Sequence, residues 1–239
     1  MVEMPELTRR MKMQKVVVPV TAYFDQLQGI LYERPGYEVK IAENLARLDN
    51  GDFTGELKRD EIIEFLAKQE LQLPASCLLF YFASTDRNAK LLKDYFGRNP
   101  ERTCYREHTG TKLVTPAGWE SDRKDNGKYL RDVFEYRDNW RGKGDWIQVA
   151  EGVLVPDNGK IIGVNQAIGL PAETTNIATG HMGNWYFNPS LSESAVLFGG
   201  YNSGRNRYFD ISANTDPSYT DGYLGFRPAW GCIPIPKAV

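Results

Sequence analysis

Apolar residues recur at helical spacing in the first hundred residues of the chain, and this periodicity fades after Asn99. Intervals of three and four between apolar positions are typical of helices that bury one face. Asp60 precedes one such run at a position that suits an N-cap, and Gly97 follows another where a helix can end. The pattern predicts three short helices, over residues 37–48, over 60–70, and from Thr85 or Asp86 to Phe96.

Strand-like patterns occur on both sides of this change. Residues 16–24 are rich in β-branched and aromatic side chains, and Pro19 indicates an edge strand or a bulge. The continuous apolar run at 78–83 predicts a buried strand. The clearest signal is at 144–164, where apolar residues alternate with polar ones on either side of a turn at Asp157-Asn-Gly-Lys160. This last segment predicts a strand, a turn and a second strand.

Early helices followed by short strands and long loops predict an α+β fold. The chain has no internal repeat, no low-complexity linker and no long block of charge. A single domain over residues 1–239 is therefore the simplest organisation.

Composition limits the classes of function. Of the 239 residues, 41% are hydrophobic and 25% are charged, which is typical of a soluble globular protein. A formal net charge of −2 argues against a general nucleic-acid binder, and no apolar run is long enough to cross a bilayer. The charged N-terminus does not resemble a secretion signal. We therefore expect no nucleic-acid partner and no direct membrane insertion.

The chemistry of metal sites is poorly represented. The three cysteines are widely spaced without a CxxC motif, and only two histidines occur, His108 and His181. These numbers argue against a structural zinc site and against a disulfide framework, so we expect buried thiols, with a single disulfide as the alternative. No metal and no cofactor are predicted.

A polar, tyrosine-rich stretch begins at Gly199 and lies between two apolar, strand-like segments, 194–198 and 224–230. The pattern predicts a long loop over about 201–223. Its mixture of tyrosine with serine, asparagine and glycine is also found in antibody binding loops, where tyrosine supplies a large, stiff contact. Turn-rich loops without any partner have a similar composition, so composition alone leaves both interpretations open.

The frame of this stretch carries a family resemblance. Gly199-Gly200 after a core strand, the polar stretch, and Gly225-Phe226-Arg227 together resemble the C-terminal part of the C-type lectin fold. The branch concerned includes formylglycine-generating enzymes and the variable proteins of diversity-generating retroelements. The resemblance covers about 195–230 and does not extend to residues 1–97. It implies a C-type lectin-like fold with two or three short helices, a mainly antiparallel sheet and long loops. Arg227 is interpreted as structural, because its guanidinium suits loop carbonyls or a carboxylate.

Each function known on this fold requires particular residues, and the sequence shows whether they are present. Formylglycine-generating enzymes bind copper through a cysteine pair, and no cysteine occurs between Cys104 and Cys232. Related iron-dependent oxidases need a histidine cluster, which two histidines cannot supply. Calcium-dependent lectins use paired acidic motifs, and the nearest segment, residues 183–189, lacks them. The variable proteins, which make no such demand, fit best.

The resemblance therefore implies a non-catalytic ligand-binding protein with a hypervariable region at about 184–230. Its ligand would be an unknown protein or a glycan, most simply a surface receptor, and its location a cell or virion surface. The alternatives are a lectin-like binding protein of fixed specificity and an uncatalogued hydrolase, which would need a concave site with a perturbed acid or base. The predicted ligand-binding residues are Tyr201, Asn202, Arg205, Asn206, Arg207, Tyr208, Asp210, Ser212, Asn214, Tyr219, Asp221 and Tyr223, joined by Asn184, Tyr186 and Asn188.

Overall fold

A computed structural model describes ten stretches of the chain. They are residues 20–23, 38–41, 46, 57–69, 71–84, 106–138, 144–177, 182–202, 207–221 and 224–230.

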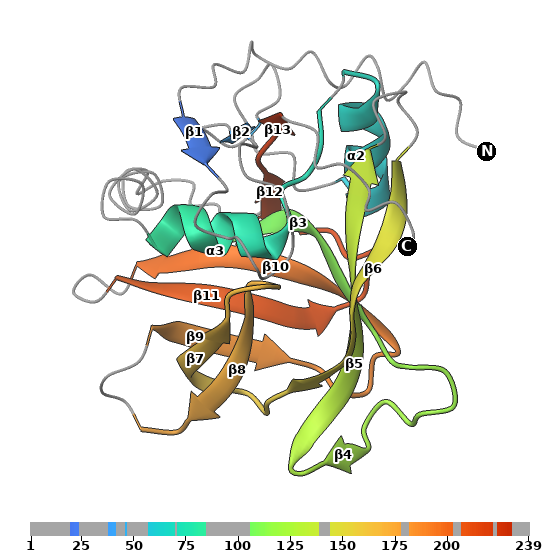
Figure 1. Ribbon diagram of the computed structural model, residues 1–239, viewed down its shortest axis with the longest axis vertical. Coiled ribbons are helices and arrows are strands. Elements are labelled where there is room, and N and C mark those ends of the chain that lie inside the picture. Colours follow the sequence, from blue (N-terminus) through green and yellow to red (C-terminus); the bar gives the residue numbers. More distant parts are fainter. Residues whose placement is uncertain are drawn as a thin grey trace.

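A large sheet dominates the described part of the molecule (Figure 1). Its central path runs β4-β5-β3-β10-β11-β9-β7-β8, with β6 paired to β5 and β12 paired to β3. Most neighbours are antiparallel, while β9 runs parallel to β11 and β12 runs parallel to β3. The strands are β3 (Arg106–Val114), β4 (Lys124–Asp125), β5 (Lys128–Asp138), β6 (Gly144–Val155), β7 (Gly159–Asn165), β8 (Leu170–Thr175), β9 (Gly183–Phe187), β10 (Glu193–Asn202), β11 (Arg207–Thr215) and β12 (Leu224–Phe226).

A small second sheet and two helices complete the described elements. The small sheet has the order β1 (Val20–Tyr23), β2 (Glu38–Ile41) and β13 (Ala229–Trp230). Gln72 and Ala229 exchange backbone hydrogen bonds of 3.0 and 2.8 Å, which join the segment between the helices to β13. The helices are α2 (Arg59–Ala67) and α3 (Ser76–Ser84).

The main core lies between α3 and one face of the large sheet. Helix α3 lies above β10 in Figure 1, and its Leu78 and Leu79 pack with Val196 and Phe198 of β10. The strand predicted at 78–83 is therefore wrong, since these residues belong to a helix. A helix buried under other elements is apolar on all sides, so it lacks the periodicity that distinguishes it from a buried strand.

Helix α2 covers a second, smaller core. Ile62 and Leu66 pack there with Phe226 of β12. The helix predicted at 60–70 is confirmed as Arg59–Ala67, although Asp60 is not its N-cap. Lys58 holds that position, and its backbone N–H donates to a carboxylate oxygen of Glu61 at 2.9 Å, so one otherwise unpaired amide at the helix start is satisfied.

Other predictions have mixed outcomes. The helix predicted at 37–48 is wrong at Glu38–Ile41, which forms β2 because it pairs with β1. The predicted first strand is confirmed at Val20–Tyr23, and the third helix falls outside the described residues. The two strands predicted within 144–164 exist, but β6 pairs with β5, whereas β7 pairs with β8 and β9, so they do not form a hairpin.

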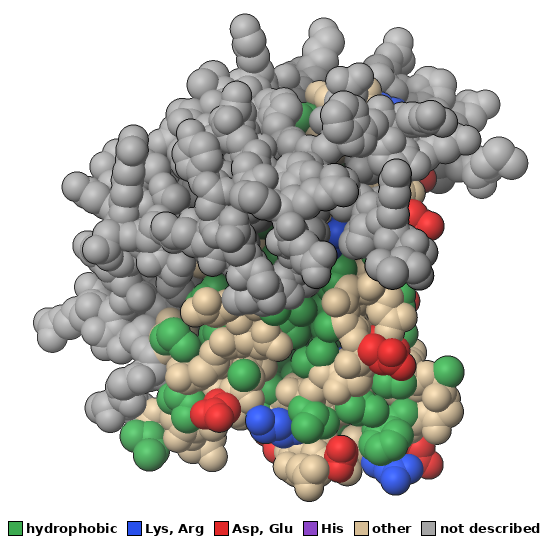
Figure 2. All heavy atoms as spheres, in the orientation of Figure 1, with side chains coloured by type: hydrophobic (Ala, Val, Ile, Leu, Met, Phe, Trp, Pro, Cys, Tyr) green, Lys and Arg blue, Asp and Glu red, His purple; other side chains and the backbone are tan. Residues whose placement is uncertain are grey.

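The described architecture is mostly sheet with few helices and is compatible with an α+β fold. Figure 2 views the molecule from the same side as Figure 1. Over the described part of this side, acidic and basic side chains form small separate groups among hydrophobic and uncharged polar ones. Neither described helix has the length and apolar character that a bilayer crossing requires.

Candidate functional site

The polar stretch after Gly199 is largely strand. Strand β10 continues to Asn202, and β11 runs antiparallel to it from Arg207 to Thr215. The two strands are in continuous register from Asn202↔Arg207 back to Leu197↔Ser212, and an irregularity precedes the last pair, Ala195↔Thr215. The long loop predicted over 201–223 is therefore wrong for much of its length. In a strand, successive side chains point to opposite faces, so a strand with one polar face can have the overall composition of a loop.

The two faces of β11 have different neighbours. Ile211 and Ala213 are fully buried in the core beneath α3. Asp210 and Ser212 point to the opposite face, where β9 runs alongside in parallel register, with Asp210 paired to Asn184 and Ser212 paired to Tyr186. Four residues predicted from the sequence to bind a ligand therefore lie next to one another across two strands.

Further residues extend this surface. Lys160 of β7 pairs with Asn184, and Arg106 projects from β3 toward Ser212. Tyr219 follows β11 and lies within electrostatic reach of Arg106. We name this surface the β9–β11 face, and it comprises Arg106, Lys160, Asn184, Tyr186, Asp210, Ser212, Asn214, Tyr219 and Asp221.

Asp210 anchors one end of the β9–β11 face. Its side chain is 6% exposed, and one carboxylate oxygen accepts hydrogen bonds from the backbone N–H and the side-chain amide of Asn184, at 3.1 and 2.7 Å. The amide oxygen of Asn184 in turn accepts a hydrogen bond from the ammonium of Lys160. Burial raises the pKa of Asp210, and the bonds from Asn184 oppose that rise. This chain of contacts holds Asn184 in one orientation.

Arg106 lies at the centre of the β9–β11 face. Its guanidinium lies over the ring of Tyr186, 5.0 Å from the ring centroid, and Nη1 donates to the Ser212 hydroxyl at 3.4 Å. Ser212 donates to the amide oxygen of Asn214 at 2.6 Å. A guanidinium within about 6 Å of an aromatic centroid makes a favourable cation–π contact. Arg106 thus connects residues of β9 and β11.

Three residues of the β9–β11 face are exposed, two are buried and the other four are half-buried. Tyr186 and Tyr219 are 37% and 39% exposed, and Asn214 is exposed as well, whereas Asp210 and Ser212 are buried. The Tyr219 hydroxyl donates to a carboxylate oxygen of Asp221 at 3.0 Å, and this bond raises the pKa of the phenol. The exposed group presents aromatic rings and an amide to solvent.

Other predicted residues lie elsewhere. The Asn188 amide oxygen accepts the backbone N–H of Ser190 at 3.1 Å, so it closes a turn after β9. Arg205, Asn206 and Tyr223 are outside the described residues. For four more, only the backbone is described, at the end of the β10–β11 hairpin: Tyr201, Asn202, Arg207 and Tyr208.

Sequence reasoning missed Arg106 and Lys160. Arg106 precedes Ser212 by 106 positions, and neither cation is part of a motif. No alternation of polar and apolar residues marks them, because Arg106 begins a continuous polar run and Lys160 precedes two isoleucines. Their contribution depends on the order β3-β10-β11-β9-β7, which pattern reasoning did not supply.

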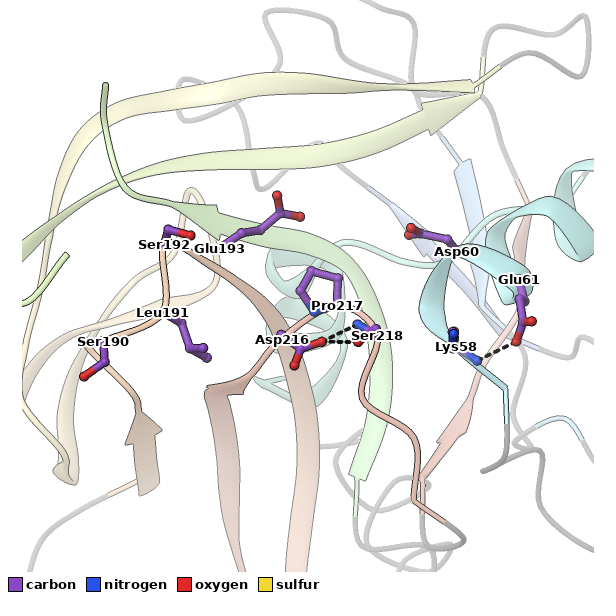
Figure 3. A pocket seen from close by; sticks show the side chains of 10 residues that line it. All are labelled: Lys58, Asp60, Glu61, Ser190, Leu191, Ser192, Glu193, Asp216, Pro217 and Ser218. Atoms are coloured by element: carbon purple, nitrogen blue, oxygen red, sulfur yellow. Dashed lines mark hydrogen bonds between the residues drawn. The ribbon is translucent and has the colours of Figure 1, made fainter. Parts of the chain in front are cut away.

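An open cleft of about 470 Å³ lies where the start of α2 approaches the loops after β9 and β11 (Figure 3). Four of its lining side chains are acidic: Asp60, Glu61, Glu193 and Asp216. Most of these carboxylates already have partners. Figure 3 marks the bonds of Glu61 to Lys58 and of Asp216 to Ser218, and Glu193 pairs with Lys112 at 3.1 Å. These three carboxylates are therefore already engaged in hydrogen bonds or an ion pair within the protein.

Within the described stretches, no group of three or more histidine, cysteine or acidic residues is arranged to hold a metal ion. Of the two histidines, His108 is 2% exposed on β3, while His181 is outside the described residues. Comparison of the chain with protein-family models, with curated proteins and with solved structures finds no match.

Proposed function

We propose that this chain is a non-catalytic binding protein with a C-type lectin-like fold, whose β9–β11 face is a diversified recognition surface of the kind used by variable proteins of diversity-generating retroelements. The observation that carries this proposal is the gathering of Asn184, Tyr186, Asp210 and Ser212 on one face of two adjacent strands. The opposite face of the same strands forms the core.

The chemistry of the β9–β11 face suits recognition of a macromolecular surface. Tyrosine buries a large area with few rotatable bonds, and an asparagine amide can both donate and accept hydrogen bonds. Tyr186, Asn214 and Tyr219 are exposed and are the expected contacts. Each tyrosine that becomes buried against a partner can contribute about 2 kcal/mol or more to binding.

The proposal is tested first by sequencing the DNA around the gene. A near-identical repeat of the segment coding for 184–230, beside a reverse transcriptase gene, is expected. The two copies should differ only where the repeat has adenine, and codons for exposed residues of the face, such as Tyr186 and Asn214, should be among those that differ. Without such a repeat and reverse transcriptase, diversification is refuted, and a binding protein of fixed specificity becomes the better interpretation.

A second experiment tests recognition itself. Tyr186, Asn214 and Tyr219 are randomised together in a displayed library of the full chain, and a library of equal size is made at Glu120, Asp122 and Glu151, which are exposed elsewhere. Both libraries are selected against one panel of purified proteins and glycans. Binders should emerge from the first library far more often. Equal yields from both libraries would contradict a dedicated recognition surface on this face.

A further inference from the structure

Arg106 is on a strand that lies outside the segment expected to vary, yet its side chain reaches into the β9–β11 face. It begins β3, and β10 separates β3 from β11 in the sheet. To reach Ser212 and the ring of Tyr186, the side chain must pass over β10. What occupies β10 at that level therefore decides whether the contact can form.

The register of β10 places a glycine at this crossing. Phe198 pairs with Glu107, so the next residue of β10, Gly199, lies level with Arg106 in the antiparallel register. Gly199 also pairs with Asp210 on the other side, whereas Ser212 pairs with Leu197. The Arg106 side chain therefore leaves β3 at the level of Gly199 and crosses β10 diagonally toward Ser212, two residues further along β11. Residues paired across strands point to the same face, so a side chain at position 199 would stand between Arg106 and β11. Glycine leaves that space open.

Arg106 affects both exposed tyrosines, Tyr186 by contact and Tyr219 through its charge. Its guanidinium lies 5.0 Å from the ring centroid of Tyr186, and its charge acts on the phenol of Tyr219. Its hydrogen bond to Ser212 supports the contact between Ser212 and Asn214. Tyr186 thus contacts the guanidinium directly and Asn214 is linked to it through the Ser212 hydroxyl, while Tyr219 lies within range of its charge.

From these contacts we infer that Arg106 is a positioning residue, which crosses β10 above Gly199 and holds the exposed side chains of the β9–β11 face in their binding arrangement. The inference rests on the proposed function, because only that function makes the arrangement one for binding. The arrangement itself is testable without any ligand. A planar guanidinium can stack on a ring and donate along its edge at the same time, which the ammonium of lysine cannot do. A surface that is held in place before it binds loses less conformational entropy on association.

The test uses the full chain and compares Arg106→Met, Arg106→Lys and Gly199→Val with the wild type. Arg123→Met is the matched control, because that guanidinium also lies over an aromatic ring, 4.1 Å from the centroid of Trp119, but outside the face. The ring resonances of Tyr186 and Tyr219 are followed by NMR with labelled tyrosine, assigned through Tyr186→Phe and Tyr219→Phe. Thermal unfolding is measured on every variant.

Arg106→Met should shift the ring signals of Tyr186 and raise the pKa of Tyr219, because a positive charge near the phenol is lost. Arg106→Lys should keep most of the effect on the Tyr219 titration but not the Tyr186 signals. Gly199→Val should shift the Tyr186 signals although Arg106 is still present, and Arg123→Met should change neither tyrosine. A purely structural role would lower the unfolding temperature without moving the Tyr219 titration, and that outcome would overturn the inference.

The two proposals fail separately. Unchanged tyrosine signals in Arg106→Met would refute the positioning role even if the displayed library yields binders. If the signals move as expected while that library yields none, the positioning role is supported, whereas the recognition function fails. Unchanged Tyr186 signals in Gly199→Val, alongside changed ones in Arg106→Met, would refute the crossing above Gly199.

Discussion

Replacing Arg227 with methionine removes the charged partner of a carboxylate that is fully buried on β3. Arg227 and Glu107 are each 0% exposed, and the guanidinium Nε donates to Glu107 Oε2 at 3.0 Å, with Nη2 at 3.5 Å from Oε1. Removal of one member of a buried ion pair costs about 3–5 kcal/mol, because the remaining charge has no compensation. We expect Arg227→Met to lower the free energy of unfolding by an amount in this range at neutral pH.

The same change should make stability depend more strongly on pH. Burial raises the pKa of Glu107, while the charge of Arg227 and its hydrogen bond oppose that rise. Without Arg227 the pKa rises further, so the folded protein holds a proton that the unfolded chain releases. Stability then falls as pH increases above the ordinary carboxyl value of 4.5 and toward the raised folded pKa. The destabilisation by Arg227→Met should be smallest near pH 4 and should grow toward pH 8.

Urea unfolding between pH 4 and pH 8, monitored by tryptophan fluorescence, measures this difference. The double variant Glu107→Gln with Arg227→Met carries neither charge and should be more stable at pH 8 than Arg227→Met alone. Arg131→Met is the control, because Arg131 is 1% exposed but donates only to carbonyl oxygens, at 2.7 to 3.0 Å, which do not titrate. A cost for Arg227→Met that is below about 1 kcal/mol, or equal at all pH values, would refute the reasoning.

Three further predictions concern buried positions. Gly169→Ala should cost at least about 2 kcal/mol in urea unfolding, since Gly169 has a φ of +65° and a Cβ would clash with the backbone of Ser76 and Cys77. Burial and the Arg59 charge lower the pKa of His108 from 6.5 to about 4. Between pH 6.5 and about pH 4 the unfolded chain binds the imidazole proton more tightly than the folded protein does. The free energy of unfolding should therefore fall by about 3 kcal/mol as pH decreases over this range, and by less in His108→Leu. Trp185→Ala should cost about 3–5 kcal/mol in thermal unfolding, because Trp185 is 1% exposed and donates to Pro156 O at 3.0 Å.

Helix prediction succeeded where one face of the helix meets solvent. In α2, Ile62 and Leu66 are buried while Glu64 is exposed, so the sequence shows the helical period. Helix α3 shows no such contrast over its described side chains, which are buried from Ser76 to Leu79. An apolar run of this length suits a strand equally well, and only the packing of α3 on the sheet distinguishes the two.

The interpretation of Arg227 as structural agrees with its place in the fold, although its partner could not be predicted. Glu107 lies 120 positions away in the sequence and is brought near because β12 pairs with the start of β3. Arg106 entered the candidate site through the same long-range pairing order. Composition indicated the segment for which recognition is proposed, whereas contacts between distant strands decide which side chains of that segment meet.

The strand character of residues 207–215 changes what kind of variation the proposed surface can accept. Ile211 and Ala213 are in the core, and Asp210 and Ser212 face the other way. A shift of one residue in β11 would place the polar set in the core and the apolar set on the face. Loops of antibodies vary in length as well as in sequence, but a strand of the sheet can accept substitution only. Of the polar positions of β11, Asn214 is exposed and should accept substitution most readily, whereas Asp210 and Ser212 are buried. A mechanism that rewrites codons in place, without inserting or deleting any, fits that constraint, because each replaced side chain remains on the face where it began.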